Sequence, residues 1–492
     1  MRYGLGGRYS IGATFQRRLG LEATAVFVLT GMVPAAVSAQ QSSAGTAPLV
    51  FDAVTVIDVE HGKLLEDQRV VIEGNHIRAV GNRSAVSLPT GAQVVPAYGK
   101  YLIPGLWDMH LHLGYPALLR QDSDGSFETL SGNLIPSDVS EQLLIVQGVT
   151  GFRDAYSYDT PLDTLVQWQR EILAGTRVGP PRQLLAGVAI YSDTSTHWSP
   201  PFTGGATVAS GDSAAVDSLV RALKHTGATW LKLKQVDAKT YFLLANAARR
   251  YGLRFGGHIE QVSPLDAADS GATLIDHTGP ENVGIFDSLC FNPDKATVAT
   301  CRPVAEKFQR TNTWSVPTLS FRAIQGSVAA IPNNIRTLLV DAVENFWANF
   351  TYNPRWPKDH TPIPAPATPD TLHFAYLKIA AEVGLPLLVG GDTGGAEAGF
   401  KTHAEMAILV DRGLTPLAAL QAATLNPARA IQATDSLGTV AAGKLADLVV
   451  LDANPLVDIT NTTMIHAVVA NGRYFDRAAL DELVAQIQTE VQ

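Results

Sequence analysis

Short apolar runs alternate with amphipathic stretches through the centre of the chain. Helical periodicity marks the stretches between the runs, for example Ser213–Thr226 and Ala238–Tyr251. Eight runs read as strands: Leu102–His110, Val149–Arg153, Gln183–Ile190, Trp230–Lys234, Arg254–His258, Thr273–His277, Trp314–Leu319 and Leu385–Gly390. Alternation of this kind predicts a parallel sheet. Eight repeats favour an α/β fold of the closed (β/α)8 TIM-barrel type.

An open doubly wound sheet is the alternative architecture for the same alternation. Folds of that kind that bind nucleotides carry a glycine-rich turn after the first strand. The run Leu102–His110 is followed instead by Leu111-His112-Leu113-Gly114, without that fingerprint. The closed barrel is therefore the preferred prediction.

Strand-like patterns without intervening helices occupy both ends of the chain. They read as strands at Val50–Ile57, Arg69–Gly74, Gly438–Val440, Ala446–Leu451 and His466–Gly472. Turn signals separate them. We therefore predict a small β-sandwich domain built from both termini, 49–103 and 433–492, flanking a barrel at 104–432.

Two irregular insertions interrupt the central pattern. Pro116–Pro136 follows the first predicted barrel strand, and the proline-rich Asn349–Asp370 precedes the last. A barrel places the loops after its strands around the active site. We therefore expect both insertions to help form a substrate pocket.

The N-terminus has the three parts of a secretory signal peptide. Arginines precede the apolar stretch Ala23–Val33, and Ala36-Val37-Ser38-Ala39 resembles a cleavage site. A membrane anchor is the alternative, but the stretch is shorter than the roughly 20 residues needed to span a bilayer. We predict a signal peptide at 1–39, a flexible linker at 40–48, and a periplasmic or secreted product. The route is Sec or, given Arg17-Arg18, twin-arginine.

Composition narrows the class of partner. The 492 residues are 46% hydrophobic and 17% charged, as in an ordinary globular enzyme, and the net charge is −9. No basic stripe stands out, so we expect a small-molecule substrate and no nucleic acid. No stable membrane span is expected after signal cleavage, and a homo-oligomer is compatible with the sequence. The two cysteines, Cys290 and Cys301, either form a disulfide, which export favours, or remain free thiols.

Candidate metal ligands stand at the ends of the predicted strands. His110 and His112 share one strand face, because residues i and i+2 point the same way. Four more candidates end their own apolar runs: Lys232, His258, His277 and Asp392. Strand ends converge on one face of a barrel, and imidazole with carboxylate suits zinc and similar ions. The pattern predicts a metal-dependent hydrolase.

The chain resembles the amidohydrolase superfamily over roughly residues 49 to 475. The resemblance is carried by Pro104-Gly105-Leu106-Trp107-Asp108-Met109-His110-Leu111-His112, Gly227-Ala228-Thr229-Trp230-Leu231-Lys232, Gly257-His258, Ile275-Asp276-His277 and Gly390-Gly391-Asp392. Further matching segments are Gly413-Leu414-Thr415-Pro416, Ala423-Thr424-Leu425-Asn426-Pro427-Ala428 and Gly443-Lys444-Leu445-Ala446-Asp447-Leu448. The branch it resembles is the imidazolonepropionase-like one, which includes exported or membrane-associated Xaa-Pro dipeptidases.

The resemblance implies a role for each candidate ligand. His110 and His112 would hold one divalent ion together with Asp392, and His258 and His277 a second one, both expected to be zinc. Lys232 would be carboxylated and bridge the two ions. Lys234 lies on the same strand face, so the register is open, and the spacing after Gly227-Ala228 favours Lys232.

The expected chemistry is attack of a metal-bridged hydroxide on a carbonyl, with Asp392 moving the proton to the leaving nitrogen. Tyr156, Tyr191 and His197 follow the second and third strands and are candidate substrate-binding residues. Arg322 follows the seventh strand and could hold a substrate carboxylate. Each of the four could equally be a solvated or packing residue. His403 and Glu405 are expected in the helix after Asp392.

Three functions fit these features. The first is an exported amidohydrolase that cleaves an amide or peptide-like C–N bond, such as a dipeptidase. The second is a hydrolase of a cyclic amide, lactone or carbamate with the same site, because a fold and its metals do not encode the substrate. The third is a non-catalytic binding protein on the same scaffold. That protein should have lost ligands, and none is missing.

Overall fold

The computed structural model describes residues 47–114, 119–121, 127–129, 136–157, 159–194, 205–278, 290–291, 296–320, 375–392 and 394–490. The predicted signal peptide, nearly all of the predicted linker, the Asn349–Asp370 insertion, His197 and Arg322 lie outside these residues. Predictions for them stay predictions. Among the described residues, none of the helices combines the length and apolar character that crossing a membrane requires.

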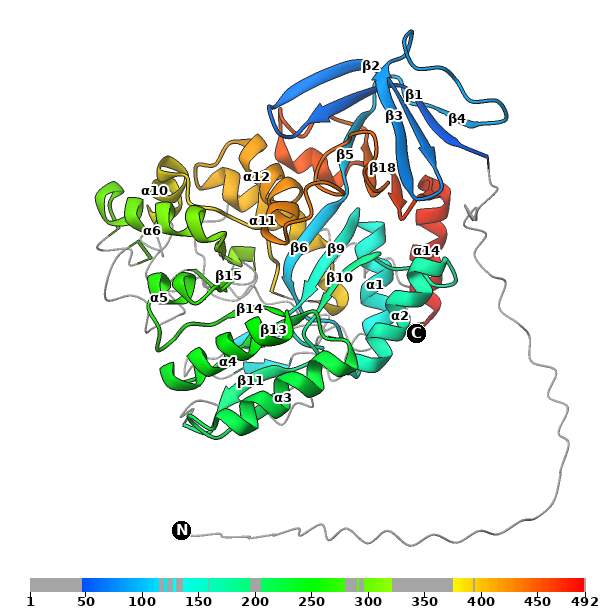
Figure 1. The fold of residues 1–492 in the computed structure, drawn as a ribbon. Coiled ribbons are helices and arrows are strands. Elements are labelled where there is room, and N and C mark those ends of the chain that lie inside the picture. Colours follow the sequence, from blue (N-terminus) through cyan, green and yellow to red (C-terminus); the bar gives the residue numbers. More distant parts are fainter. Residues whose placement is uncertain are drawn as a thin grey trace, which may run out of the picture. The chain divides into compact units, whose positions relative to one another are not determined.

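Strands from both ends of the chain form one eight-stranded sheet (Figure 1). Its order is β19-β18-β17-β5-β1-β2-β3, with β4 paired to β1. The strands are β1 (Leu49–Asp58), β2 (Lys63–Glu73), β3 (His76–Asn82), β4 (Gln93–Pro96), β5 (Tyr101–Pro104), β17 (Leu448–Leu451), β18 (Ile465–Ala470) and β19 (Arg473–Phe475). The joint between the two ends is the antiparallel pair β5 and β17. Buried side chains such as Phe51, Ile72 and Val469 form the sheet's own core.

The central strands form two further sheets whose strands are all parallel. One has the order β10-β9-β6, and the other β12-β11-β13-β14-β15-β16. The strands are β6 (Leu106–Leu111), β9 (Val149–Asp154), β10 (Arg182–Leu185), β11 (Ala189–Ser192), β12 (Gly205–Val208), β13 (Trp230–Leu233), β14 (Arg254–Gly257), β15 (Leu274–Asp276) and β16 (Trp314–Val316). The α/β class and the parallel sheet are thus confirmed.

Backbone hydrogen bonds link these two sheets at both of their ends. Thr229, immediately before β13, donates its N–H to the carbonyl of Leu185 in β10 (2.9 Å). On the other side, residues 385–390 lie between β16 and β6. Leu388 N–H donates to Ser315 O (2.9 Å), and Met109 N–H donates to Val389 O (2.8 Å). Eight chain segments therefore follow one another in a hydrogen-bonded circuit.

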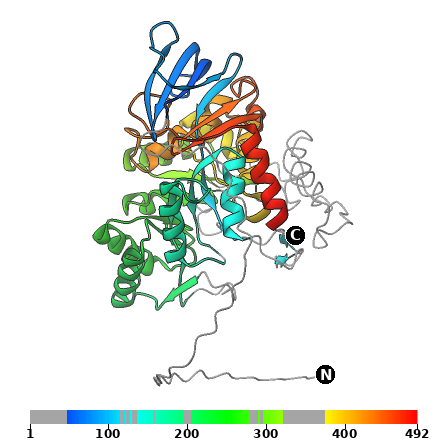
Figure 2. The ribbon, with the colours of Figure 1, turned by 90° about the vertical axis from the view of Figure 1, so that its right-hand side faces the viewer.

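Helices follow most of the central strands. They are α1 (Ser137–Val146), α2 (Leu162–Ala174), α3 (Ser213–Thr226), α4 (Ala238–Tyr251), α5 (Pro264–Asp269), α6 (Val298–Thr311), α10 (Ala375–Val383), α11 (Phe400–Asp411), α12 (Pro416–Ala422), α13 (Leu425–Ala430) and α14 (Arg477–Glu490). The predicted bounds of α3 and α4 are confirmed. Each begins at an aspartate, Asp212 or Asp237, whose carboxylate accepts the N–H bonds that a helix start leaves unpaired. The C-terminal helix α14 packs beside α1 (Figure 2).

Three strand predictions need correction. The third barrel strand is split into β10 and β11, because the chain turns between them at Gly187, whose φ of 80° suits glycine. Leu385–Gly390 is not a strand but makes a single bridge, Ser315 with Leu387. Pro386 has no N–H for a ladder and glycines follow it, so the pairing stops early. Gly438–Val440 is not a strand either.

Two smaller features concern the predicted insertions and cysteines. Within Pro116–Pro136 the described residues include a short antiparallel pair, β7 (Leu119–Gln121) and β8 (Phe127–Thr129), where irregular structure was expected. Cys290 and Cys301 form a disulfide with their Cα atoms 4.3 Å apart. Both cysteines are buried in the core, and Cys301 belongs to α6.

Candidate metal centre

All six candidate ligands lie at the C-terminal ends of the central segments. His110 is the last residue but one of strand β6, and His112 comes directly after that strand. Lys232 is inside β13. His258, His277 and Asp392 come directly after β14, β15 and the segment 385–390. Five of the six candidate ligands are buried, and the exception is His258, whose side chain is 14% exposed.

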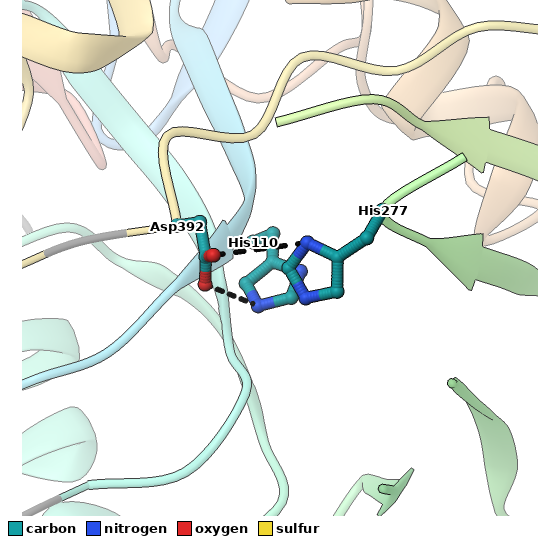
Figure 3. A group of neighbouring side chains, drawn as sticks. All are labelled: His110, His277 and Asp392. Atoms are coloured by element: carbon teal, nitrogen blue, oxygen red, sulfur yellow. Dashed lines mark ion pairs between the residues drawn. The ribbon is translucent and has the colours of Figure 1, made fainter. Parts of the chain in front are cut away.

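Asp392 faces His110 and His277 (Figure 3), and His112 also lies beside its carboxylate. Its Oδ1 lies 2.9 Å from His110 Nε2 and 3.2 Å from His112 Nε2. Its Oδ2 lies 3.7 Å from Nδ1 of His277. One nitrogen or oxygen from each of His110, His277 and Asp392 falls within 4.8 Å of the others. Residues far apart in sequence thus share one point.

His258 and Lys232 complete the group from the adjacent strands. The rings of His258 and His277 are 4.7 Å apart and nearly perpendicular. Burial lowers the pKa of Lys232 to about 8, although the neighbouring Asp276 opposes the shift. A large fraction of this lysine is therefore the neutral amine near pH 8.

The chemistry of the donor set fits a divalent transition metal. Both ring nitrogens of His110 are buried without a well-directed hydrogen bond, although carboxylate oxygens lie 2.9 and 3.0 Å away. Burial lowers the pKa of His112 to about 4, and burial also holds the pKa values of His258 and His277 well below the usual range. Neutral imidazoles with free lone pairs are the form that binds metals.

Asp392 keeps its charge despite being buried. Burial alone would raise its pKa, but the neighbouring His277, His110 and His112 together hold it well below the usual range. At neutral pH the residue is therefore a carboxylate. In that form it can serve as a ligand and accept a proton.

Beneath the histidines lies a buried ionic network that the sequence analysis did not single out. Asp276 accepts two hydrogen bonds from Nη2 of Arg153 (3.0 and 2.9 Å) and another from the Lys232 ammonium. His110 Nδ1 lies 3.0 Å from the same carboxylate. Burial opposes ionisation of Asp276, but Arg153, His110 and Lys232 keep its pKa well below the usual range. In the sequence, this network was indicated only by charged residues within the apolar runs Val149–Arg153 and Thr273–His277.

Asp108 ties the first strand to the segment that carries Asp392. Its carboxylate accepts hydrogen bonds from the backbone N–H of His110 (3.0 Å), from that of Gly391 (3.2 Å) and from the Thr402 hydroxyl (2.8 Å). Burial raises its pKa to about 6. The neighbouring Gly390 permits the close approach, because a Cβ there would stand 2.7 Å from the Cβ of His110.

Three residues of the site have left-handed backbone conformations. His277, Thr318 and Asp392 have φ values of 52°, 54° and 53°. Such conformations cost non-glycine residues about 1 kcal/mol or more and persist where the surroundings enforce them. Thr318 lies next to His277, with its hydroxyl 2.8 Å from the His277 Nδ1. The backbone at these strand ends is thus shaped to aim the ligands.

The predicted substrate residues divide into two groups. His197 and Arg322 lie outside the described residues. Tyr156 and Tyr191 are buried together at the ends of β9 and β11. Tyr156 packs against His112 with ring centroids 4.3 Å apart, and its carbonyl oxygen lies 3.1 Å from His112 Nδ1. Lys234 joins them, since its Nζ donates to the Tyr156 hydroxyl (3.1 Å).

His403 and Glu405 lie in α11, outside the ligand group. His403 links the Thr462 hydroxyl (2.9 Å) to the carbonyl of Gln147 (3.0 Å). Glu405 accepts hydrogen bonds from the backbone N–H groups of Leu319 and Ser320, and so fixes the chain after β16. Both side chains have structural partners that account for their burial.

Comparison with known proteins agrees with this geometry. Residues 372–474 match the amidohydrolase family. This part of the chain is thus similar to amidohydrolases. Two dihydroorotases match short segments, one from Trichlorobacter lovleyi with 41% identity over 70 residues and one from Streptomyces coelicolor with 46% over 59 residues. These matches cover 14% and 12% of this chain, and 16% and 13% of the two relatives.

Solved structures resemble this chain over most of its length. A Bifidobacterium longum protein described as a prolidase superposes with a TM-score of 0.62 and 21% identity, covering 90% of this chain and 99% of the other. A Xaa-Pro dipeptidase with methionine in its active site gives 0.60 and 18%, covering 87% and 100%. The A. niger ochratoxinase gives 0.59 and 20%, covering 87% and 96%. The resemblance in fold predicted from the sequence is confirmed.

Proposed function

We propose that this protein is a metal-dependent amidohydrolase that cleaves an amide or peptide-like C–N bond, such as that of a dipeptide. The observation that carries the proposal is the carboxylate of Asp392 held between His110, His112 and His277 at the strand ends. Structures of similar fold include proteins described as a prolidase and as a Xaa-Pro dipeptidase, which supports a peptide-like substrate.

The proposed architecture is a closed (β/α)8 barrel with a β-sandwich domain contributed by both termini. The hydrogen-bonded circuit of eight segments supports the barrel. The pairing of β5 with β17 supports a domain made from both ends. In such a barrel the ligands converge on the C-terminal face, where active sites of this fold lie.

Two divalent ions, which we propose to be zinc, would be held by residues of adjacent strands. His110, His112 and Asp392 would bind one ion, and His258 and His277 the other, with a carboxylated Lys232 between them. When bound, such ions lower the pKa of water and polarise a carbonyl group. The unsatisfied nitrogens of His110 support this assignment.

Lys232 would bridge the ions only after reacting with carbon dioxide. An ammonium repels cations, whereas a carbamate supplies two anionic oxygens. The neutral amine adds its lone pair to the carbon of carbon dioxide and releases one proton. Burial favours this reaction because it lowers the pKa of Lys232 to about 8. Asp276, itself held by Arg153, would keep the Nζ of Lys232 in place.

Asp392 would move the proton during hydrolysis. Its ionised carboxylate accepts a proton as water attacks the carbonyl carbon. The same carboxyl group then protonates the leaving nitrogen, so that the amine departs neutral. Its contacts with His110, His112 and His277 fix the orientation of the carboxylate throughout.

We also propose that the chain is exported to the periplasm or beyond the cell. The basic start, the apolar stretch Ala23–Val33 and the cleavage-like Ala36–Ala39 support this. The disulfide Cys290–Cys301 suits an oxidising compartment.

A substrate screen of the metal-loaded protein tests the proposed function. Purified mature protein, reconstituted with zinc and bicarbonate, is assayed against dipeptides, N-acyl amino acids, cyclic amides, lactones and carbamates. We expect hydrolysis of an amide or peptide-like bond that Asp392→Asn abolishes. Turnover of lactones or cyclic amides alone would establish the alternative substrate class. A protein that binds metal but hydrolyses nothing in the panel would contradict the proposal.

A further inference from the structure

Lys234 lies one strand repeat beyond Lys232. Its backbone N–H donates to the carbonyl of Ile190 (2.9 Å), so the pairing of β13 with β11 continues to this residue. Residues i and i+2 of a strand face the same side, roughly 6.6 Å apart along it. The side chain of Lys234 is therefore on the same face as that of Lys232, farther toward the strand end.

The ammonium of Lys234 sits among aromatic side chains next to a candidate metal ligand. It donates to the Tyr156 hydroxyl (3.1 Å) and lies 5.1 Å from the centre of that ring. Tyr156 in turn packs on His112. Tyr156 and Tyr191 are buried together, with 3% and 7% of their surfaces exposed. The group is thus continuous with the proposed reaction site.

Charge distinguishes Lys234 from the other cations near it. Lys232 and Arg153 both pair with Asp276, and the buried Lys401 pairs with Glu397. Within the part of the chain that the structure describes, no carboxylate forms an ion pair with Lys234. Glu260, in the turn after β14, lies 3.4 Å from Nδ1 of His258. A half-buried ammonium whose hydrogen-bond partners among the described residues are tyrosine hydroxyls is well suited to an external anion.

We propose that Lys234, with Tyr156 and Tyr191, binds a free carboxylate of the substrate. The inference rests on the proposed function and narrows its substrate class to amides that carry a carboxylate, such as dipeptides and N-acyl amino acids. The separation of Lys234 from Lys232 along the strand is comparable with about two residues of extended peptide. A carboxylate one residue from the scissile bond would therefore come within reach of the long lysine side chain.

The test compares each carboxylate substrate with its carboxamide. The probes are dipeptides and N-acetyl amino acids and the same compounds with the carboxylate converted to an amide, all measured with the zinc-loaded full chain. Wild type should prefer the acids. Lys234→Met should reduce the acid-to-amide ratio of kcat/KM by about 10- to 100-fold, mainly through KM, because a hydrogen bond to a charged group is lost. Lys234→Arg should retain part of the preference.

Four further variants sharpen the comparison. Tyr156→Phe and Tyr191→Phe should each raise KM for the acids by about 3- to 10-fold, the effect of a lost neutral hydrogen bond. They also serve if Lys234→Met does not fold. Lys63→Met removes an exposed lysine of β2 and should leave the ratio unchanged. Arg322→Met tests the other carboxylate anchor expected from the sequence.

The outcomes separate this inference from the proposed function. If amides are hydrolysed but Lys234→Met keeps the wild-type ratio, or Arg322→Met alone abolishes it, the inference is wrong while the proposed function stands. If no amide is hydrolysed, the proposed function fails, and calorimetric binding of the same pairs decides the inference. Tighter binding of acids that Lys234→Met removes supports it, and equal binding of acids and carboxamides overturns it.

Discussion

Asp392 is joined to His110 through both backbone and side chain. The Asp392 N–H donates to the His110 carbonyl (2.7 Å), and its Oδ1 lies 2.9 Å from His110 Nε2. The hydrogen bond fixes the backbone of Asp392, whose conformation is left-handed. The contact of its carboxylate with His110 can therefore lengthen only if the Asp392 side chain rotates. The arrangement defines where the carboxylate sits before any substrate arrives.

Asp392→Asn should separate proton transfer from metal binding. Asparagine keeps the shape and the backbone hydrogen bond, but it cannot accept the proton. We expect a folded protein that retains most of its metal and loses at least about 10²- to 10⁴-fold in kcat. Steady-state kinetics and metal analysis measure both quantities. Activity within a few-fold of wild type would exclude this role for Asp392.

His110→Ala and His258→Ala should each lower metal content and abolish activity. Each substitution removes an imidazole from a different half of the proposed two-metal site. Elemental analysis after dialysis provides the measurement. His403→Ala is the matched control, because that buried histidine bonds Thr462 and Gln147 rather than a ligand. Two metals and full turnover in the His110 variant would show that the ligand assignment is wrong.

Lys232→Ala should bind metal poorly and recover partly with short carboxylic acids. Formate or acetate can supply the anionic oxygens that a carbamate would provide. Lys234→Ala should keep its metal, since that lysine lies among tyrosines. Metal content with and without added acid is the measurement. The reverse ranking of the two variants would reverse the assignment of the bridging lysine.

Reconstitution of the metal-free protein should depend on pH through Lys232. Burial lowers its pKa to about 8, so below that pH the reactive amine falls about tenfold per unit as protons are added. Activation by zinc at a fixed partial pressure of carbon dioxide should therefore become faster from pH 6.5 toward 8.5 and then level off. Acetate-rescued Lys232→Ala lacks the amine and should not show this rise. Equal pH profiles for the two proteins would rule out carbamate formation as the cause.

The sequence correctly predicted elements whose structure depends on interactions between residues close together in the chain. Helices α3 and α4 begin and end where expected, because their apolar spacing and aspartate caps act within a few residues. The segment 385–390 was wrongly expected to be a strand, because its single bridge depends on how Ser315 meets Leu387. The ion pair between Arg153 and Asp276 was not predicted, because it also depends on a contact between distant parts of the chain. Those residues are 123 positions apart, and only folding brings them together.

The candidate metal ligands were easier to predict from the sequence than the residues that hold them in position. His110 and His112 share a strand face by simple alternation, and histidines at strand ends are conspicuous. Asp108, Asp276 and Thr318 act through other residues, and a polar residue within an apolar run does not by itself reveal which partner it holds. From the sequence, Lys234 was considered only as an alternative to Lys232 for the bridging lysine. Its contact with Tyr156 required the arrangement of β9 and β13.

The mature protein should begin near Gln40 and carry the Cys290–Cys301 disulfide. Export would expose the cysteines to an oxidising compartment, and the structure places them within bonding distance. Closing a loop of this size stabilises a protein by about 3 kcal/mol in the chain-entropy model. Cys290→Ser with Cys301→Ser should therefore unfold at a lower denaturant concentration than wild type. Intact mass of the secreted protein decides both points, because a mass that starts at Met1, or two thiols alkylated without reductant, would contradict export and the disulfide respectively.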